Sequence, residues 1–280
     1  MNKKTQLFFT LLLCILLAAC SQENQESEST TAPAETTANA PTHEEDKTPE
    51  QQDVHWSYEG ETGPEHWGEL HPDYALCTNG TEQSPINIDT SELQASELLD
   101  DMTIHYEPTT FTVINNGHTI QANAAEMNNS ILIGEKEYQL AQFHFHTPSE
   151  HQFNDKHFEM ELHFVHKNDE GKLAVLGVMI KEGKENKPLQ QLWEQMPTET
   201  TTEGKKLDQS VDILNILPEN KTTFQYSGSL TTPPCSEGVK WLVLEQPIEM
   251  SKEQIEAFQN IFPHNNRPIQ PLNEREVLKK

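Results

Sequence analysis

The chain has 280 residues, a formal net charge of −26 and a hydrophobic fraction of 34%. Its 45 acidic residues outnumber 19 basic ones and would repel a phosphate backbone, so nucleic acid is not expected among its partners. The length allows two ordinary domains or one large β domain. The low hydrophobic fraction indicates that part of the chain lies outside any core.

The first 20 residues have the pattern of a secretory signal. Lys3 and Lys4 precede a 13-residue, almost wholly apolar run, Leu7 to Ala19, which is shorter than the ~20 residues of a membrane span. The run ends in Leu-Ala-Ala-Cys, which resembles the lipobox of bacterial lipoproteins and implies a lipid on Cys20. The alternative is an ordinary signal peptide with an incidental cysteine. With the lipid, the protein would be exported and anchored to the outer face of the cell membrane, or on the periplasmic side if the cell has an outer membrane.

Residues 21–52 are expected to form a disordered acidic linker. From residue 21 to residue 50 there is no Val, Ile, Leu, Met, Phe, Trp or Tyr, and eight acids accompany the single Lys47. Such a segment cannot bury enough apolar surface to offset the entropy lost on ordering. Its charge favours an extended, solvated chain.

The cysteines suggest one disulfide. If Cys14 leaves with the signal peptide and Cys20 carries the lipid, Cys77 and Cys235 remain. An even pair in an exported chain favours a disulfide between them, although two buried free thiols are the alternative.

Residues 53–280 are expected to form one mainly β domain with a few short helices. They contain short alternating runs separated by turn signals, and neither an internal repeat nor a second linker. Pro188 opens one helical pattern, and Ser251 with Gln254 forms a capping box before another. The predicted strands, in chain order, cover 111–114, 118–123, 138–146, 158–166, 172–181 and 239–245.

Three histidines are spaced like metal ligands. His144 and His146 alternate with two phenylalanines, so in a strand both imidazoles share one face. His163 lies in a second alternating run with Glu161 on its own face. If the two strands are neighbours, three imidazoles converge and leave a fourth tetrahedral position open, as in catalytic zinc sites. The alternative is that these are ordinary surface or hydrogen-bonded core histidines.

Several motifs together resemble the α-class carbonic anhydrases. They occur in the family's order over residues 55–272 and comprise Gly63-Pro64-Glu65-His66-Trp67-Gly68, Gln83-Ser84-Pro85-Ile86-Asn87-Ile88, Asn115-Asn116-Gly117-His118, Gln142-Phe143-His144-Phe145-His146, Ser149-Glu150-His151, Glu161-Leu162-His163, Leu230-Thr231-Thr232-Pro233-Pro234 and Asn266-Arg267-Pro268. The resemblance implies a single domain around a large, mostly antiparallel central sheet. It also implies reversible hydration of carbon dioxide to bicarbonate and a proton.

The resemblance assigns roles to particular residues. It implies that His144, His146 and His163 bind Zn²⁺, whose hydroxide attacks carbon dioxide. Gln142 and Glu161 would orient ligand imidazoles, and the partner of Glu161 is left open. The remaining implied residues are Thr231, which orients the hydroxide; Glu150, its partner; His118, the proton shuttle; and Val165, Val175, Leu230, Thr232, Val239 and Trp241, the substrate pocket.

Two other classes of protein are considered. The spacing of His144, His146 and Glu150 imitates the start of a cupin motif, but His157 stands where a cupin needs glycine. A zinc-capture lipoprotein would bind metal without catalysis, and such proteins usually carry a flexible His-rich loop that this sequence lacks. A stopped-flow assay of carbon dioxide hydration, with and without chelator, separates the three hypotheses.

Overall fold

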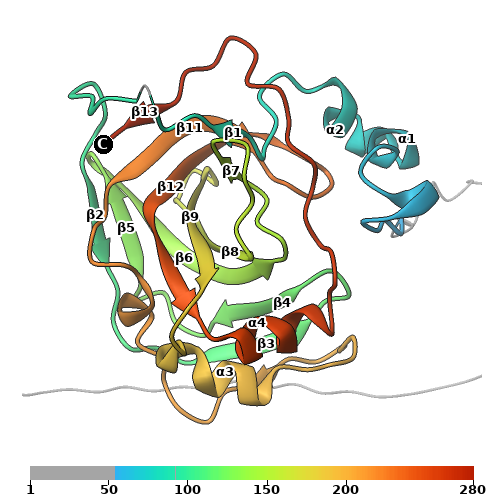
Figure 1. Ribbon diagram of the computed structural model, residues 1–280, viewed down its shortest axis with the longest axis vertical. Helices are drawn as coiled ribbons and strands as arrows, with labels where there is room; N and C mark the ends of the chain where they lie inside the picture. Colours follow the sequence, from blue (N-terminus) through green and yellow to red (C-terminus); the bar gives the residue numbers. More distant parts are fainter. Residues whose placement is uncertain (1–53, 92) are drawn as a thin grey trace, which may run out of the picture. The chain divides into compact units, whose positions relative to one another are not determined.

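The alternating runs of the sequence become strands of one curved sheet, shown in Figure 1. The computed structural model describes residues 54–280 except Glu92, so the predictions for 1–20, 21–52 and Cys20 lie outside the described residues. Within this part of the chain, no helix is long and apolar enough to cross a membrane.

The main sheet holds eleven strands among the described residues, and all its pairings are antiparallel except that of β9 with β12. A second, two-stranded sheet pairs β1 (Asn87–Ile88) with β7 (Gln152–Phe153). The order in the main sheet is β10 (Lys205–Lys206), β3 (Phe111–Asn115), β4 (Ile120–Ala124), β6 (Lys136–His146), β8 (Met160–Lys167), β9 (Leu173–Glu182), β12 (Glu237–Met250), β11 (Thr223–Ser229) and β13 (Leu278–Lys279), with β5 (Ser130–Ile133) also on β6 and β2 (Met102–His105) on β5.

Both predicted hairpins are confirmed. β3 pairs with β4 around Gly117, whose φ of 87° is a left-handed conformation that glycine adopts without strain. β8 pairs with β9 around Gly171, whose φ is 79°. The predicted end of the strand at Glu245 is wrong, because β12 continues to Met250 after a register shift between Leu244 and Ile248. This irregularity accommodates Pro247, which cannot donate a hydrogen bond to a regular ladder.

The helices are short, as expected. The capping box is confirmed, since Ser251 accepts a hydrogen bond from the Gln254 amide and the Gln254 side chain bonds back to the Ser251 amide. The helical segments are η1 (Gly60–Thr62), α1 (Trp67–Leu70), η2 (Pro72–Tyr74), α2 (Leu76–Asn79), η3 (Lys187–Leu189), α3 (Gln190–Gln195), η4 (Ile213–Ile216) and α4 (Lys252–Gln259).

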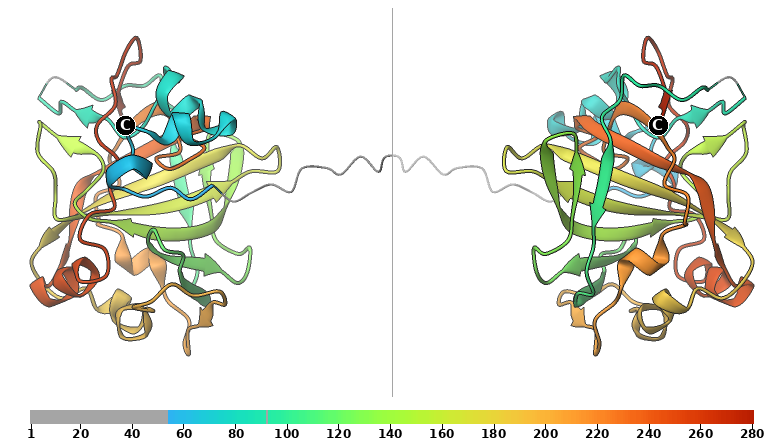
Figure 2. Two further views of the ribbon diagram at one scale, coloured as in Figure 1. Left: turned by 90° about the vertical axis from the view of Figure 1, so that its right-hand side faces the viewer. Right: turned by 90° about the vertical axis from the view of Figure 1, so that its left-hand side faces the viewer.

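The two faces of the central sheet have different contents. One face carries the main core, in which Phe145 packs edge-on against Trp193 of α3, with ring centroids 4.8 Å apart. Figures 1 and 2 show α3 and α4 together on one side of the strands, with α1 and α2 on the other. Because side chains alternate along a strand, His144, His146 and His163 lie on the face opposite to the main core.

The disulfide between Cys77 and Cys235 is confirmed. The two Cα atoms are 5.0 Å apart, and the residues are separated by 158 positions in the sequence. In the chain-entropy account, closing a loop of this length stabilises the fold by about 4–5 kcal/mol. The disulfide packs against the buried Trp67 and ties α2 to the loop that follows Thr231.

His166 is buried in the main core, on the face opposite to the three clustered histidines. Tyr106 Oη donates to His166 Nε2 at 2.6 Å, and His166 Nδ1 donates to the Ala174 carbonyl at 3.3 Å. Burial lowers the pKa of His166 to about 4, against the opposing effect of its backbone hydrogen bonds. His166 is therefore neutral in the folded protein at pH values where an unfolded chain already takes up a proton.

Acidification should destabilise the fold through His166. Since its folded pKa is below the unfolded value, the free energy of unfolding falls as the pH drops from about 6.5 to 4, by up to about 3 kcal/mol from this residue. His166→Gln keeps an acceptor for Tyr106 but cannot titrate, so urea unfolding at pH 7 and 4.5 should show a smaller pH dependence. His105→Gln, on the exposed edge strand β2, is the control. Equal pH dependence in His166→Gln and the unaltered protein would contradict this assignment.

Candidate metal centre and active site

The pairing of β6 with β8 brings three imidazoles together. His144 lies directly opposite His163 in the antiparallel register, and His146 lies two residues further along β6. The ring centroids are 4.9 Å apart for His144 and His146, 5.3 Å for His144 and His163, and 4.6 Å for His146 and His163. One nitrogen of each ring lies within 4.8 Å of those of the other two.

Hydrogen bonds determine which nitrogen each ring presents. His144 Nδ1 donates to Gln142 Oε1 at 2.8 Å, and His146 Nδ1 donates to the Asn265 carbonyl at 2.7 Å. His163 uses the other nitrogen, since its Nε2 donates to Glu161 Oε1 at 2.8 Å. The nitrogens left free are therefore Nε2 of His144 and His146 and Nδ1 of His163.

The cluster has the properties of a metal site. Burial lowers the pKa of all three imidazoles, and that of His146 reaches about 4. They are therefore neutral near pH 7, with lone pairs available for a cation. His146 Nε2 is buried and has no hydrogen-bond partner among the described residues, which is costly unless another group satisfies it. These residues fit a divalent metal, and three imidazoles leave one tetrahedral position free.

Glu161 is a buried carboxylate with four hydrogen-bond donors. Its Oε1 accepts from His163 Nε2 and from His151 Nδ1, each at 2.8 Å, and its Oε2 accepts from the Glu150 and His151 amides, each at 2.8 Å. Burial alone would raise its pKa, but His151 and His163 hold the pKa well below the usual range. The sequence left open which imidazole of the cluster Glu161 orients; it is that of His163, on the same strand.

Sequence reasoning assigned no role to two residues that hold this site together. His151 is the last residue of the Ser149-Glu150-His151 motif. Its Nε2 accepts a hydrogen bond from Tyr226 Oη at 2.6 Å, which extends the network that begins at Glu161. Asn265 is fully buried; besides its bond to His146, its Nδ2 donates to the His118 carbonyl at 3.0 Å. Asn265 lies 119 residues from His146 and acts there through its backbone, so no local pattern marks it.

Glu150 lies beside the cluster with one oxygen satisfied. Its Oε1 accepts from the Arg267 amide at 2.9 Å, whereas its buried Oε2 lies 3.5 Å from His146 Nε2. Burial raises the pKa of Glu150 to about 7, against the opposing effects of His163 and of the Arg267 amide. Its Oε2 has no hydrogen-bond partner among the described residues, so the pairing with Thr231 stays a prediction.

A cavity of about 260 Å³ opens over the three imidazoles. Every pocket residue predicted from the sequence lines this cavity except Val239. Val239 is 2% exposed and packs in a hydrophobic cluster with Trp241 and Val243. The lining residues are Trp56, Tyr58, Asn116, His118, Thr119, Gln121, Gln142, His144, His146, His163, Val165, Val175, Leu230, Thr231, Thr232 and Trp241.

His118 stands in this cavity and stacks on Trp56. The two ring centroids are 3.7 Å apart and the planes differ by 6°. Burial, and then the charge of His55, lower the pKa of His118. Its backbone is fixed by Asn116 Oδ1, which accepts from the His118 amide at 2.9 Å. Trp56 was not singled out from the sequence, because its contact with His118 depends on how residues far apart in the chain are packed.

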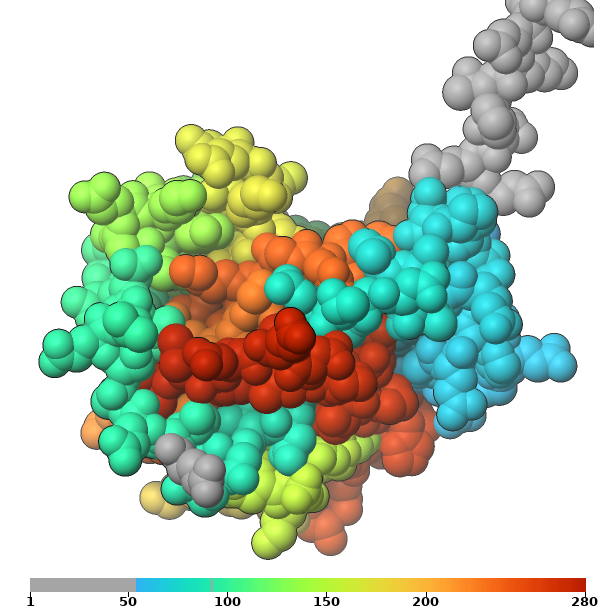
Figure 3. All heavy atoms as spheres, turned by 90° about the horizontal axis from the view of Figure 1, so that it is seen from above, coloured from blue at the N-terminus to red at the C-terminus, as the bar shows by residue number. Residues whose placement is uncertain are grey.

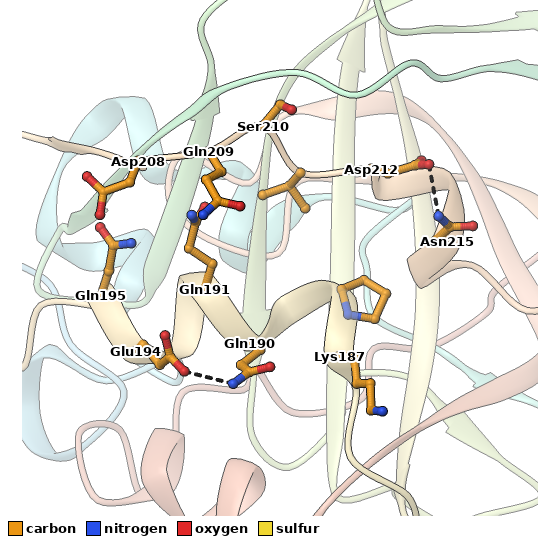
Figure 4. A pocket seen from close by; sticks show the side chains of 12 residues that line it. Lys187, Gln190, Gln191, Glu194, Gln195, Asp208, Gln209, Ser210, Asp212 and Asn215 are labelled. Atoms are coloured by element: carbon orange, nitrogen blue, oxygen red, sulfur yellow. Dashed lines mark hydrogen bonds between the residues drawn. The ribbon is translucent and has the colours of Figure 1, made fainter.

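A larger hollow of about 530 Å³ lies between α3 and residues 208–215 (Figure 4). Its polar side chains bond to one another: Gln190 Nε2 donates to Glu194 Oε1, and Asn215 Nδ2 donates to Asp212 Oδ2, each at 2.8 Å. No imidazole is among the described residues that line it. The chemistry therefore belongs to the smaller cavity.

Comparisons with known proteins agree with this geometry. The family model described as eukaryotic-type carbonic anhydrase matches residues 62–280. Carbonic anhydrases of Klebsiella pneumoniae and Pectobacterium carotovorum are 48% and 45% identical over 226 residues, which is 80% of this chain and 90% and 91% of theirs. The α-carbonic anhydrase of Thermovibrio ammonificans in complex with sulfanilamide has a TM-score of 0.77 and 46% identity, covering 80% of this chain and 99% of that one. The chain belongs to the α-class carbonic anhydrase family and is a carbonic anhydrase.

Proposed function

We propose that the chain hydrates carbon dioxide reversibly with a zinc ion held by His144 Nε2, His146 Nε2 and His163 Nδ1. The convergence of these three neutral imidazole nitrogens carries the proposal. Three neutral ligands leave the ion its full charge, which lowers the pKa of a bound water to about 7 and supplies a nucleophile at neutral pH.

The neighbouring groups hold the imidazoles in the required tautomers. One N–H group of each ring donates a hydrogen bond to an oxygen of Gln142, Asn265 or Glu161. The other nitrogen of that ring therefore keeps its lone pair. Since Glu161 is a carboxylate, it also raises the basicity of His163 as a ligand. Each of the three acceptors lies on a strand or in a buried segment, which limits motion of the rings.

Thr231 and Glu150 would orient the reacting oxygen. The Arg267 amide occupies one oxygen of Glu150, so the other oxygen can accept a hydrogen bond from the Thr231 hydroxyl. With its proton donated to Glu150, the Thr231 hydroxyl can only accept a hydrogen bond from the nucleophile. This fixes the direction of the attacking lone pair, a gain from orientation.

The cavity wall suits the substrate and the product. Val165, Val175, Leu230 and Trp241 offer carbon dioxide an apolar surface beside the imidazoles. Thr232 also lines the cavity, and its hydroxyl can hydrogen-bond to bicarbonate.

Stopped-flow hydration of carbon dioxide tests the zinc proposal. Activity should disappear after treatment with a chelator and return on addition of zinc. Glu161→Gln should weaken zinc affinity about 10–100-fold, because it removes the charge that supports His163. Equilibrium dialysis measures the affinity independently of turnover, with His105→Gln as a matched control outside the site. Bound zinc without hydration would instead favour the zinc-capture hypothesis, and undiminished activity in metal-free protein would refute the proposal.

We further propose that His118 carries the product proton from the cavity to solvent. Its ordinary pKa is about 6.5, it is half-buried in the cavity, and its ring stacks on Trp56 near the exposed His55. In weak buffer, His118→Ala should slow turnover on the order of 10²-fold, and added imidazole should restore it. His105→Ala is the control. An unchanged rate in weak buffer, or a loss that imidazole does not relieve, would contradict the role.

Export and lipid anchoring through Cys20 complete the proposal and rest on the sequence of residues 1–20 alone. In a bacterial host, the protein should take up labelled palmitate and partition with membranes. Cys20→Ser should abolish both effects while leaving carbon dioxide hydration unchanged. Labelling that persists in Cys20→Ser would refute this assignment.

A further inference from the structure

A third cavity lies next to one end of the main core. It has a volume of about 410 Å³ and is lined by residues at the starts of β9 and β12, in the middle of β11 and in β13. In Figure 3 the surface is hollowed at this end of the molecule, where orange strand residues are seen between the yellow, green and red segments. Its volume is in the range of small-molecule pockets, and none of its lining residues belongs to the catalytic cavity.

The strand register explains why cations border this cavity. Lys240 lies opposite Ala174 of β9 and opposite Ser227 of β11, and Lys172 precedes Ala174 by two positions. The two lysines therefore share one face of the sheet. Along that face the next residue of β12 is the fully buried Leu242, so the cavity is the open end of the main core.

The cavity combines an apolar surface with unpaired cations. Leu99, Leu278 and the Tyr138 ring supply the apolar surface. Neither Lys172 nor Lys240 forms an ion pair with any residue that the structure describes, although the chain carries 45 acids. Glu276 is the single acid among the described lining residues.

A buried amide adds a further polar group. Gln225 is only 4% exposed and lines the cavity, and its Nε2 donates to Thr223 Oγ1 at 2.9 Å. This bond orients the amide. A few placed polar groups within an apolar pocket are typical of small-molecule sites, where they determine how the ligand is oriented.

We propose that this cavity binds a small organic monocarboxylate with a compact apolar body. The carboxylate would lie between Lys172 and Lys240, where two ammonium groups can form charge-assisted hydrogen bonds. The apolar body would lie on Leu99, Leu278 and Tyr138. A polyphosphate is disfavoured, because two lysines beside Glu276 cannot neutralise several charges.

Isothermal titration calorimetry of the zinc-loaded full chain with 4-phenylbutyrate tests the proposal. We expect a Kd of about 0.1–1 mM, and at least tenfold weaker binding of the neutral 4-phenylbutanamide, roughly the effect of losing one charge-assisted hydrogen bond. Lys240→Gln and Lys172→Gln should each weaken binding of the acid about tenfold. Lys187→Gln, outside the cavity, should not change it.

The controls separate this cavity from the zinc site. Lys172 is exposed, so Lys172→Gln keeps the test valid even if the half-buried Lys240 cannot be replaced without unfolding. No binding at about 10 mM, or binding that neither lysine variant weakens, would overturn the proposal. The latter result would place the carboxylate at the metal. Calorimetry reports binding directly, so a failure here would leave the proposal on carbon dioxide hydration untouched.

Discussion

The antiparallel pairing of β6 with β8 is the constraint on which the site depends. It places His144 opposite His163 and Phe143 opposite Phe164, so one register supplies the imidazole cluster on one face and part of the core on the other. A shift by one residue would turn the imidazoles into the core and the rings of the phenylalanines toward the cavity. The packing of the aromatic face therefore also maintains the geometry of the three imidazoles.

The second constraint is the buried charge of Glu161. An unpaired carboxylate in this position would be very costly, but here four N–H groups donate to it. Two of the donors are backbone amides of the Glu150–His151 segment, so Glu161 fixes Glu150 as well as His163. The same carboxylate thus links the three imidazoles to the segment that carries Glu150.

Long-range contacts join the remaining parts of the cavity. Asn265 bonds to the backbone of His118 and to the imidazole of His146, although all three lie in different segments. Arg267 donates its amide to Glu150, while its guanidinium donates to the carbonyl of Cys77. The segment from Asn265 to Arg267 therefore connects the disulfide, His118 and the histidine cluster through hydrogen bonds.

Features that depend on neighbours in the chain could be predicted from the residues alone. Period-two alternation placed His144 and His146 on one face, Gly117 and Gly171 marked the hairpin turns, and Ser251 with Gln254 marked the start of α4. The motifs added the family, and with it the large antiparallel sheet. These predictions succeed because alternation, turns and caps are decided over a few residues.

Contacts between distant segments became known from the fold and not from any local pattern. It showed that Glu161 bonds to His163 and His151, that Asn265 supports His146, and that Val239 packs behind the cavity instead of lining it. It also extended β12 past Pro247 and left a cavity at the open end of the main core. Strand register, side-chain packing and burial determine these features, and all three arise only when segments far apart in the sequence meet.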